Sequence, residues 1–276
     1  MVVEEVLLRK AFYDLEKWYR PFFDFLTENQ ETYPEYKGGV TIDGYLNYEP
    51  DVLILSYNPA HGKYRDWDKE GAHLVYMGER PFGFFEKSNA RKKGSWWETD
   101  KPVEHPFLAN IVDFLYQYVT ELGIDSEYGT QKCPLWSWSD EYNFEKRIMI
   151  MNIYPIATES CIDLKRLLNK MRVNNVLPNM DTYSDEWSIR KSFIYKMHRF
   201  IEGFVKPKTI LCLGSQTISD YTWGNYEKQA GGIFTSKTYP NIIGISRSGT
   251  WTNRAKEAAK LISEIVKQNN EQRRTL

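Results

Sequence analysis

The sequence predicts an α/β fold with three layers, α/β/α, around a central, mostly parallel, four-stranded sheet. Two observations predict it: four compact apolar runs end in polar or small residues, and stretches with helical hydrophobic spacing lie between them. Buried runs that alternate with helices are typical of a parallel sheet covered on both faces. The 276 residues, 42% of them hydrophobic, are enough to bury a sizeable core, and we expect one domain over 1–276.

The elements are expected in a simple order along the chain. An N-terminal helical segment covers about residues 1–35, where apolar residues recur at helical spacing, and a short strand follows near 39–42. The four apolar runs predict the strands Val52–Tyr57, Ile148–Ile153, Thr209–Leu213 and Ile242–Ile245. Helices are expected around Phe107–Leu122, Ile162–Met171, Ile189–Phe204 and Asn253–Lys267.

The stretch at about 84–146 is rich in Trp, Tyr, Lys and Glu and is interpreted as an insertion that carries a helix. Four of its tryptophans lie in polar surroundings, which suits stacking on planar or sugar ligands: Trp96, Trp97, Trp136 and Trp138. Packing of a loop against the body of the protein accounts for them equally well. The role of the insertion therefore stays open.

Composition limits the kinds of partner and cellular compartment that the protein can have, but it does not identify a ligand. The formal net charge is -1, so any polyanion would have to meet a local basic surface. Three widely spaced cysteines (Cys133, Cys161 and Cys212) fit free thiols in a reducing compartment, and neither they nor the four scattered histidines predict a metal site. The chain shows no signal-peptide core and no long apolar run, which predicts a cytoplasmic protein without a membrane partner.

Polar residues follow each predicted strand, at the edge where α/β sheets bind ligands. Asn58 to Gly62 follow the first run, Asn152 ends the second, Gly214 to Gln216 follow the third, and Ser246 to Ala255 follow the fourth. No strand end carries an obvious nucleophile and base, and no glycine-rich phosphate loop is present. Cys212 lies inside a buried run and is interpreted as a core residue.

Four segments resemble, in order, the motifs of the uracil-DNA glycosylase superfamily. "SYNPAHG" resembles the first motif, GQDPYHG in the uracil-specific branch and G-x-N-P-G in the mismatch-specific and single-strand-selective branches. "RPFGFF" is similar to the segment whose phenylalanine stacks on the extruded base, here Phe82. "IMIMNIYPI" resembles the strand whose asparagine reads the pyrimidine, here Asn152, and "ISRSGTW" occupies the place of the loop that clamps DNA.

The resemblance implies a monofunctional DNA glycosylase, which hydrolyses the N-glycosidic bond of a pyrimidine flipped out of duplex or single-stranded DNA. Asn58 takes the water-positioning place, and His61 would support its loop by hydrogen bonding. The base would be surrounded by Tyr57, Ala60, Phe82 and Asn152. The DNA would be contacted by Ser246, Arg247, Ser248, Gly249 and Trp251. No cofactor, metal or obligate protein partner is implied.

Two departures from the family leave the substrate open. The uracil-specific branch has a tyrosine where this chain has Ala60, so the pocket would admit thymine or a larger base. The expected substrate is uracil or a 5-substituted pyrimidine, such as hydroxymethylated or glucosylated cytosine in phage DNA, with repair or antiviral defence as the setting. The final loop lacks the histidine of that branch, and Ser246 or Arg247 stands near its place.

Several of these residues have a second interpretation that does not involve DNA. A basic cluster offers candidate phosphate contacts, although such runs are by default solvated: Lys87, Arg91, Lys92 and Lys93. Trp251 could fill the gap left by a flipped nucleotide, or cap the fourth strand. The whole chain could instead be a catalytically silent nucleic-acid-binding module on the same fold, or could bind a nucleotide or sugar nucleotide.

Overall fold

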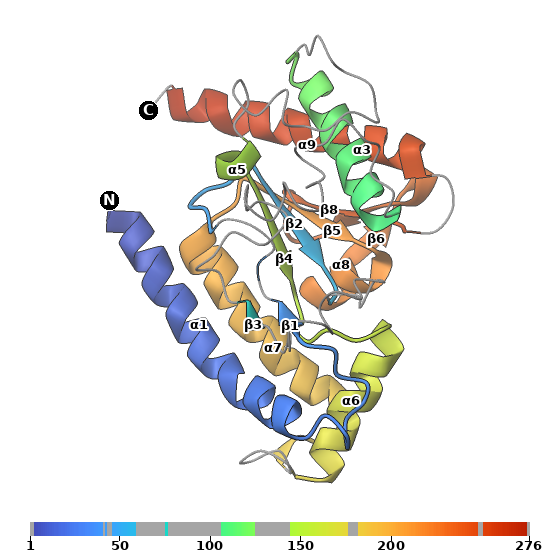
Figure 1. Ribbon diagram of the computed structural model, residues 1–276. Helices are drawn as coiled ribbons and strands as arrows, with labels where there is room; N and C mark the ends of the chain where they lie inside the picture. The colour runs from blue at the N-terminus through green and yellow to red at the C-terminus, as the bar shows by residue number, and fades with distance from the viewer. Residues whose placement is uncertain are drawn as a thin grey trace, which may run out of the picture.

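The computed structural model of the protein describes residues 3–40, 42, 46–58, 75–76, 106–124, 144–175, 182–247 and 251–274. A mixed β-sheet lies at the centre, with helices on both of its faces (Figure 1). The predicted α/β class is confirmed.

The sheet has six strands in the spatial order β4-β2-β5-β8-β7-β6. The first four are parallel and coincide with the four apolar runs: β4 (Ile148–Asn152), β2 (Val52–Ser56), β5 (Thr209–Leu213) and β8 (Ile242–Ile245). The last two pair antiparallel: β7 (Ile233–Ser236) and β6 (Tyr226–Lys228). The prediction of a four-stranded sheet is therefore wrong.

The two additional strands were missed because neither is an apolar run. β6 is half-buried at Tyr226 and exposed at its other two residues, and β7 is buried only at Ile233 and Phe234. Strands at the edge of a sheet that keep one face in water need few apolar side chains. The short 3₁₀ turn η4 (Ala230–Gly232) joins them, with positive φ at both of its glycines.

The parallel strands are buried on both faces. In β2, Leu53 and Leu55 belong to the core on one side of the sheet, whereas Val52 and Ile54 belong to the core on the other side. Because side chains alternate across a strand, burial on both faces requires a continuous apolar run. This is why the sequence could predict these four strands.

One face of the sheet is covered by α1 (Val3–Glu28), α6 (Cys161–Val173), α7 (Glu186–Phe200) with the π-helical η3 (Ile201–Val205), and α8 (Ser215–Tyr221). α1 buries a residue at every third or fourth position from Leu8 to Leu26, in agreement with the predicted amphipathic helix. Its Tyr19 ring stacks on Phe193 of α7, with 5.5 Å between the ring centroids.

The other face is covered by α3 (Pro106–Glu121) and α9 (Trp251–Arg274). α3 confirms the helix predicted within the stretch 84–146, and its Phe114 and Tyr118 share a core with the strands. It is therefore part of one layer of the fold, together with α9. A short helix, α5 (Phe144–Arg147), leads directly into β4. No helix in the described part of the chain is long and apolar enough to cross a membrane.

The segment that follows α1 runs along the outer edge of β4. Isolated antiparallel bridges join Gly39 to Ile156 and Ile42 to Met151. A separate pair of short parallel strands involves the same segment: β1 (Gly39–Val40) and β3 (Val75–Tyr76). β4 therefore has β2 on one side and a bridge from Ile42 on the other.

One carboxylate ties together the starts of three strands. Asp51, directly before β2, pairs with Lys208 Nζ at 2.6 Å and with Arg147 Nη1 at 3.1 Å. Arg147 comes directly before β4, and Lys208 directly before β5. The amino edge of the sheet is thus held by ion pairs among neighbouring strands.

The order in which the chain builds the sheet reverses at β2. The chain leaves β2, crosses by way of α3 and enters β4, and then returns by way of α6 and α7, on the opposite face, to β5 on the other side of β2. Open α/β sheets bind ligands at the carboxyl ends of the strands where the order reverses. The residues that follow β2, β4 and β5 are therefore the candidates for a functional site.

Asp113 provides a test of the packing between α3 and α9. Burial raises the pKa of its carboxyl above the usual 3.8, although hydrogen bonds with Thr252 and Gln117 act in the opposite direction. The folded state therefore holds this proton more tightly than the unfolded state, and the stability it provides is lost as the pH rises through the folded-state pKa. We expect Asp113→Asn, which cannot ionise, to unfold at more urea than the wild type at pH 7. The difference should disappear below about pH 4.

Asp185, the N-cap of α7, is the matched control because its pKa moves the other way. Its carboxylate accepts hydrogen bonds from the hydroxyl and the backbone N–H of Ser188, both at 2.7 Å, and these lower its pKa below 3.8. Asp185→Asn should therefore unfold at less urea than the wild type at pH 7 and lose this deficit on acidification. The same pH dependence in both variants would contradict a raised pKa at the buried Asp113 carboxyl.

Candidate functional site

The two asparagines predicted to act on the base come from neighbouring strands. β2 and β4 pair in register, with Ser56 opposite Asn152. The pairing continues past both strands, because the Tyr154 amide donates to the Tyr57 carbonyl at 2.9 Å. Asn58 and Asn152 therefore lie on adjacent chain segments at the carboxyl edge of the sheet.

The amide of Asn58 has a defined orientation. Its Nδ2 donates to Thr158 Oγ1 at 2.9 Å and to the Ile156 carbonyl at 3.4 Å. The buried Thr158 hydroxyl has a single proton, which it donates to the Ser160 carbonyl at 2.7 Å, so its oxygen can only accept from Asn58. The nitrogen of Asn58 is thus fixed toward Thr158, and its carbonyl oxygen lies on the other side of the amide.

The same chain of hydrogen bonds leads to the start of α6. Ser160 is the N-cap of this helix, and its Oγ accepts a hydrogen bond from the Asp163 amide at 3.2 Å. Its hydroxyl donates to the Asp163 carboxylate at 2.6 Å. A capped helix is a rigid support, so Asn58 is held by α6 as well as by its own strand.

Asn152 is the last residue of β4 and is only 6% exposed. A ligand that touches its amide must itself be largely withdrawn from water. An amide both donates and accepts, so it can read the edge of a heterocyclic base.

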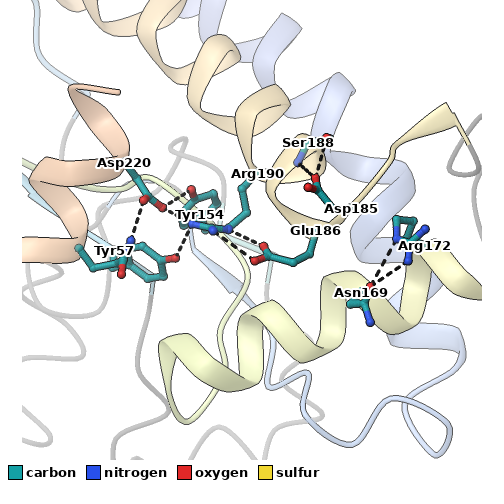
Figure 2. Close-up of polar contacts among 10 residues, drawn as sticks. Tyr57, Tyr154, Asn169, Arg172, Asp185, Glu186, Ser188, Arg190 and Asp220 are labelled. Carbon is teal, nitrogen blue, oxygen red and sulfur yellow. Dashed lines mark hydrogen bonds and ion pairs between the residues drawn. The ribbon is translucent and has the colours of Figure 1, made fainter. Parts of the chain in front are cut away.

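A cluster of polar side chains, all of them buried except Glu186, joins α7 and α8 to the ends of β2 and β4 (Figure 2). Asp220 of α8 accepts hydrogen bonds from the Tyr154 hydroxyl at 2.7 Å and from Arg190 Nη1 at 2.5 Å. Arg190 Nη1 also donates to the Tyr57 hydroxyl at 3.2 Å. One turn earlier on α7, Glu186 forms a second ion pair, with Arg190 Nε at 2.6 Å. We call these five residues the Asp220 cluster.

Burial dominates the protonation behaviour of the cluster. It raises the pKa of the Tyr57 and Tyr154 hydroxyls, and the Asp220 carboxylate raises both further. Burial by itself would lower the pKa of Arg190, but the hydrogen bonds with Glu186 and the other acidic neighbours hold it above its usual value. At neutral pH the cluster therefore has protonated tyrosines and a charged Arg190.

This placement bears on the predicted role of Tyr57. Its side chain is 5% exposed, its ring lies edge-on to Tyr154 with 4.8 Å between centroids, and its hydroxyl faces Arg190. Contact of Tyr57 with a base stays a prediction.

Sequence reasoning missed the Asp220 cluster, although one signal was present. On α7 the buried stripe consists of Ile189, Arg190, Phe193, Ile194, Met197, His198 and Phe200. An arginine at helical spacing among apolar residues must be paired if it is buried. The stripe could have predicted a buried acidic partner, but not that this partner is Asp220, 30 positions later.

The loop after β8 approaches the same edge of the sheet. The Ser246 amide donates to the Gly232 carbonyl at 2.8 Å, and the Ser246 carbonyl accepts from Arg254 Nη1 at 3.4 Å. Arg247 is exposed, but its aliphatic stem lies over Gly214, where a Cβ would be 3.4 Å from Arg247 Cδ. Gly214 has φ 104°, a conformation that favours glycine.

Cys161 acts electrostatically on a residue of this loop and on a residue at the end of β2. As the first residue of α6, it lies close enough to both Tyr57 and Arg247 that a thiolate there would raise the pKa of each. Burial around the guanidinium lowers the pKa of Arg247, and Cys161 acts against this.

Trp251 is anchored to α3. It is the first residue of α9 and half-buried, and its indole Nε1 donates to the Asn110 carbonyl at 2.9 Å. This is the arrangement of a packing residue, and its contact with DNA stays a prediction.

Several predicted residues lie outside the described part of the chain. Among the site residues these are Ala60, His61, Phe82, Ser248 and Gly249. The candidate phosphate contacts Lys87, Arg91, Lys92 and Lys93 do too. Among the residues that are described, no three His, Cys, Asp or Glu side chains are arranged to hold a metal ion.

No family model and no curated protein matches the chain. The resemblance to the glycosylase superfamily therefore stays a prediction. The geometry of the strand ends has to carry the functional argument.

Thr158 is a test of how Asn58 is held. Thr158→Val keeps the shape of the side chain but removes one hydrogen-bond partner from Asn58 Nδ2 and one from the Ser160 carbonyl. We therefore expect the free energy of unfolding to fall by about 1–3 kcal/mol. Urea unfolding measures this change.

Thr222→Val is the control for this variant. Thr222 is equally buried, but its hydroxyl donates only to the Ile218 carbonyl. That carbonyl already accepts a hydrogen bond from the Thr222 backbone amide. Thr222→Val should lower the free energy of unfolding by clearly less than Thr158→Val does. Equal losses in the two variants would mean that the contact between Asn58 and Thr158 adds nothing of its own.

Proposed function

We propose that the protein is a monofunctional DNA glycosylase that hydrolyses the N-glycosidic bond of a pyrimidine flipped out of DNA. The observation that carries the proposal is the in-register pairing of β2 with β4. It brings Asn58 and Asn152, 94 positions apart in the chain, to adjacent places at the edge where α/β sheets bind ligands.

The fixed amide of Asn58 suits the proposed chemistry. With Nδ2 committed to Thr158 and Ile156, the carbonyl oxygen of Asn58 is the atom that would orient a water molecule. An amide is not a useful base, so the reaction would depend on stabilising the departing base rather than on removing a proton. The bond to the base breaks, the base leaves with the bonding electrons, and water adds to C1′ of the sugar. The proton that the added water loses is taken up by the departing base.

Asn152 and Arg247 fit the two other requirements of such a reaction. The Asn152 amide would donate to the base as negative charge grows on it, and its burial makes this hydrogen bond stronger than it would be in water. Arg247 brings a positive charge to the rim of the site, where it could meet a phosphate of the DNA strand. Extrusion of the base costs a few kcal/mol, which such contacts have to offset.

The substrate proposed is uracil or a 5-substituted pyrimidine, including hydroxymethylated and glucosylated cytosine. This range is proposed because Ala60 stands where the uracil-specific branch has a tyrosine, and a methyl side chain in that place would leave room beside the fifth carbon of the ring. Removal of a damaged base and defence against phage with modified DNA are the two settings that this range would serve.

A panel of oligonucleotides tests the proposal. Each carries one candidate base (uracil, mismatched thymine, hydroxymethylcytosine or its glucoside), and alkali cleaves the strand wherever a base has been released. We expect the wild type to release one of these bases without cutting the strand before alkali is added. Asn58→Ala and Asn152→Ala should each slow release by about 10²–10³-fold, as loss of a charge-stabilising or orienting amide does elsewhere.

Asn241→Ala is the matched control for the two asparagine variants. Asn241 is half-buried at the opposite edge of the sheet, where its Nδ2 donates to the Lys208 carbonyl at 3.4 Å. This variant should release the base at the wild-type rate. Salt-sensitive DNA binding with no release from any oligonucleotide would instead identify a silent nucleic-acid-binding module. Tighter binding of free nucleotides than of DNA would contradict both functions.

A further inference from the structure

We propose that the Asp220 cluster is a positioning device that holds Asn58 and Asn152 in a fixed relation to one another. The inference rests on the proposed function, because the reaction proposed there needs both asparagines at once. Both tyrosine hydroxyls are engaged within the cluster, and in this inference they act as positioning groups.

One arm of the cluster leads to Asn152. Tyr154 stands two positions after it, and the Tyr154 hydroxyl donates to Asp220 Oδ2 at 2.7 Å. Tyr154 is fully buried, so this hydrogen bond has no competition from water. The end of β4 is thereby tied to α8 at a defined distance.

The other arm leads to Asn58. Tyr57 directly precedes it, and the Tyr57 hydroxyl accepts a hydrogen bond from Arg190 Nη1 at 3.2 Å. The same Nη1 pairs with Asp220 Oδ2 at 2.5 Å, so both arms meet on one carboxylate oxygen. The two strand ends are thus connected through side chains as well as through their backbones.

The Arg190–Asp220 pair at the centre of the cluster is itself held by further contacts. Arg190 is fixed by two hydrogen bonds to the Glu186 carboxylate, at 2.6 and 3.2 Å, and its guanidinium lies over the Trp187 ring at 4.4 Å. The other oxygen of Asp220, Oδ1, accepts from Gln216 Nε2 at 2.7 Å. With its partners fixed in this way, the Asp220 carboxylate has little freedom to move.

The energies of buried ion pairs and hydrogen bonds indicate that the Asp220 cluster positions residues more than it stabilises the fold. A buried ion pair contributes little net stability, and well-packed apolar residues of similar volume often stabilise a fold as much or more. Hydrogen bonds differ from apolar contacts in being directional, so they can define the height and tilt of a strand end. A displacement of about 1 Å in a reacting group can slow catalysis by about 10²-fold.

The double variant Tyr57→Phe/Tyr154→Phe tests the inference, because it removes both arms and keeps the rings and the Arg190–Asp220 pair. Tyr221→Phe is the matched control. Tyr221 is fully buried and adjacent to Asp220 in the chain, and its hydroxyl has no hydrogen-bond partner among the described residues. The control makes the same chemical change next to the cluster without removing an arm.

The first readout does not depend on activity. Hydrogen exchange of the Asn58 side-chain amide and of the Tyr154 backbone amide reports directly on the strand ends. In the double variant we expect both to exchange at least about tenfold faster than in the wild type and in Tyr221→Phe. Exchange at the wild-type rate would overturn the inference.

The second readout is base release in a single turnover, below the unfolding temperature of every variant. The double variant should release the base about tenfold more slowly or worse while its affinity for DNA stays within about twofold, because misplaced asparagines affect the reacting geometry more than binding. Tyr221→Phe should match the wild type. An active wild type and an equally active double variant would overturn the inference, even with faster exchange.

The two proposals fail in different ways. If the wild type releases no base from any oligonucleotide, the proposed function fails, and hydrogen exchange alone decides whether the cluster positions the two asparagines. If the wild type is active and the double variant is too, the proposed function stands and the positioning role does not.

Discussion

The parallel pairing of β2 with β4 is the interaction on which the rest of the site depends. It sets Ser56 opposite Asn152 and carries Asn58 to the same edge. A slip of one residue would move every side chain of a strand to the opposite face of the sheet. Because Leu53 and Val52 are buried in different cores, such a slip would expose apolar surface and bury the wrong side chains on both faces. The hydrophobic core therefore determines the register of the polar site.

The two edges of the sheet use buried charge differently. At the amino edge, Asp51 holds cations that extend from the starts of neighbouring strands, and one of them, Arg147, is half exposed. At the carboxyl edge, Arg190 and Asp220 are both nearly sealed from water and connect helices to strand ends. The first arrangement fastens strands to one another. The second sets the position of particular residues, which is why the functional proposals concentrate there.

How far the sequence predicts this structure depends on whether a feature is local. The four parallel strands were predictable because burial on both faces requires continuous apolar runs, and α1 because its buried residues recur at helical spacing. β6 and β7 were not, because their outer residues face water. Asn58 and Asn152 stood out as polar residues at the ends of apolar runs. The pairing of Arg190 with Asp220 leaves no local pattern, since it depends on how two helices pack.

The chain segment beside β4 has a consequence for the behaviour of the protein at high concentration. A strand at the margin of a sheet offers unpaired backbone groups to which a second molecule can add a strand of its own. In this protein the bridge from Ile42 to Met151 occupies the outer side of β4, and the bridge from Gly39 to Ile156 lies beyond the end of that strand. At the far margin β6 carries the charged Glu227 and Lys228. Loss of the bridge at Ile42 would therefore leave more of the β4 backbone open to pairing with a second molecule.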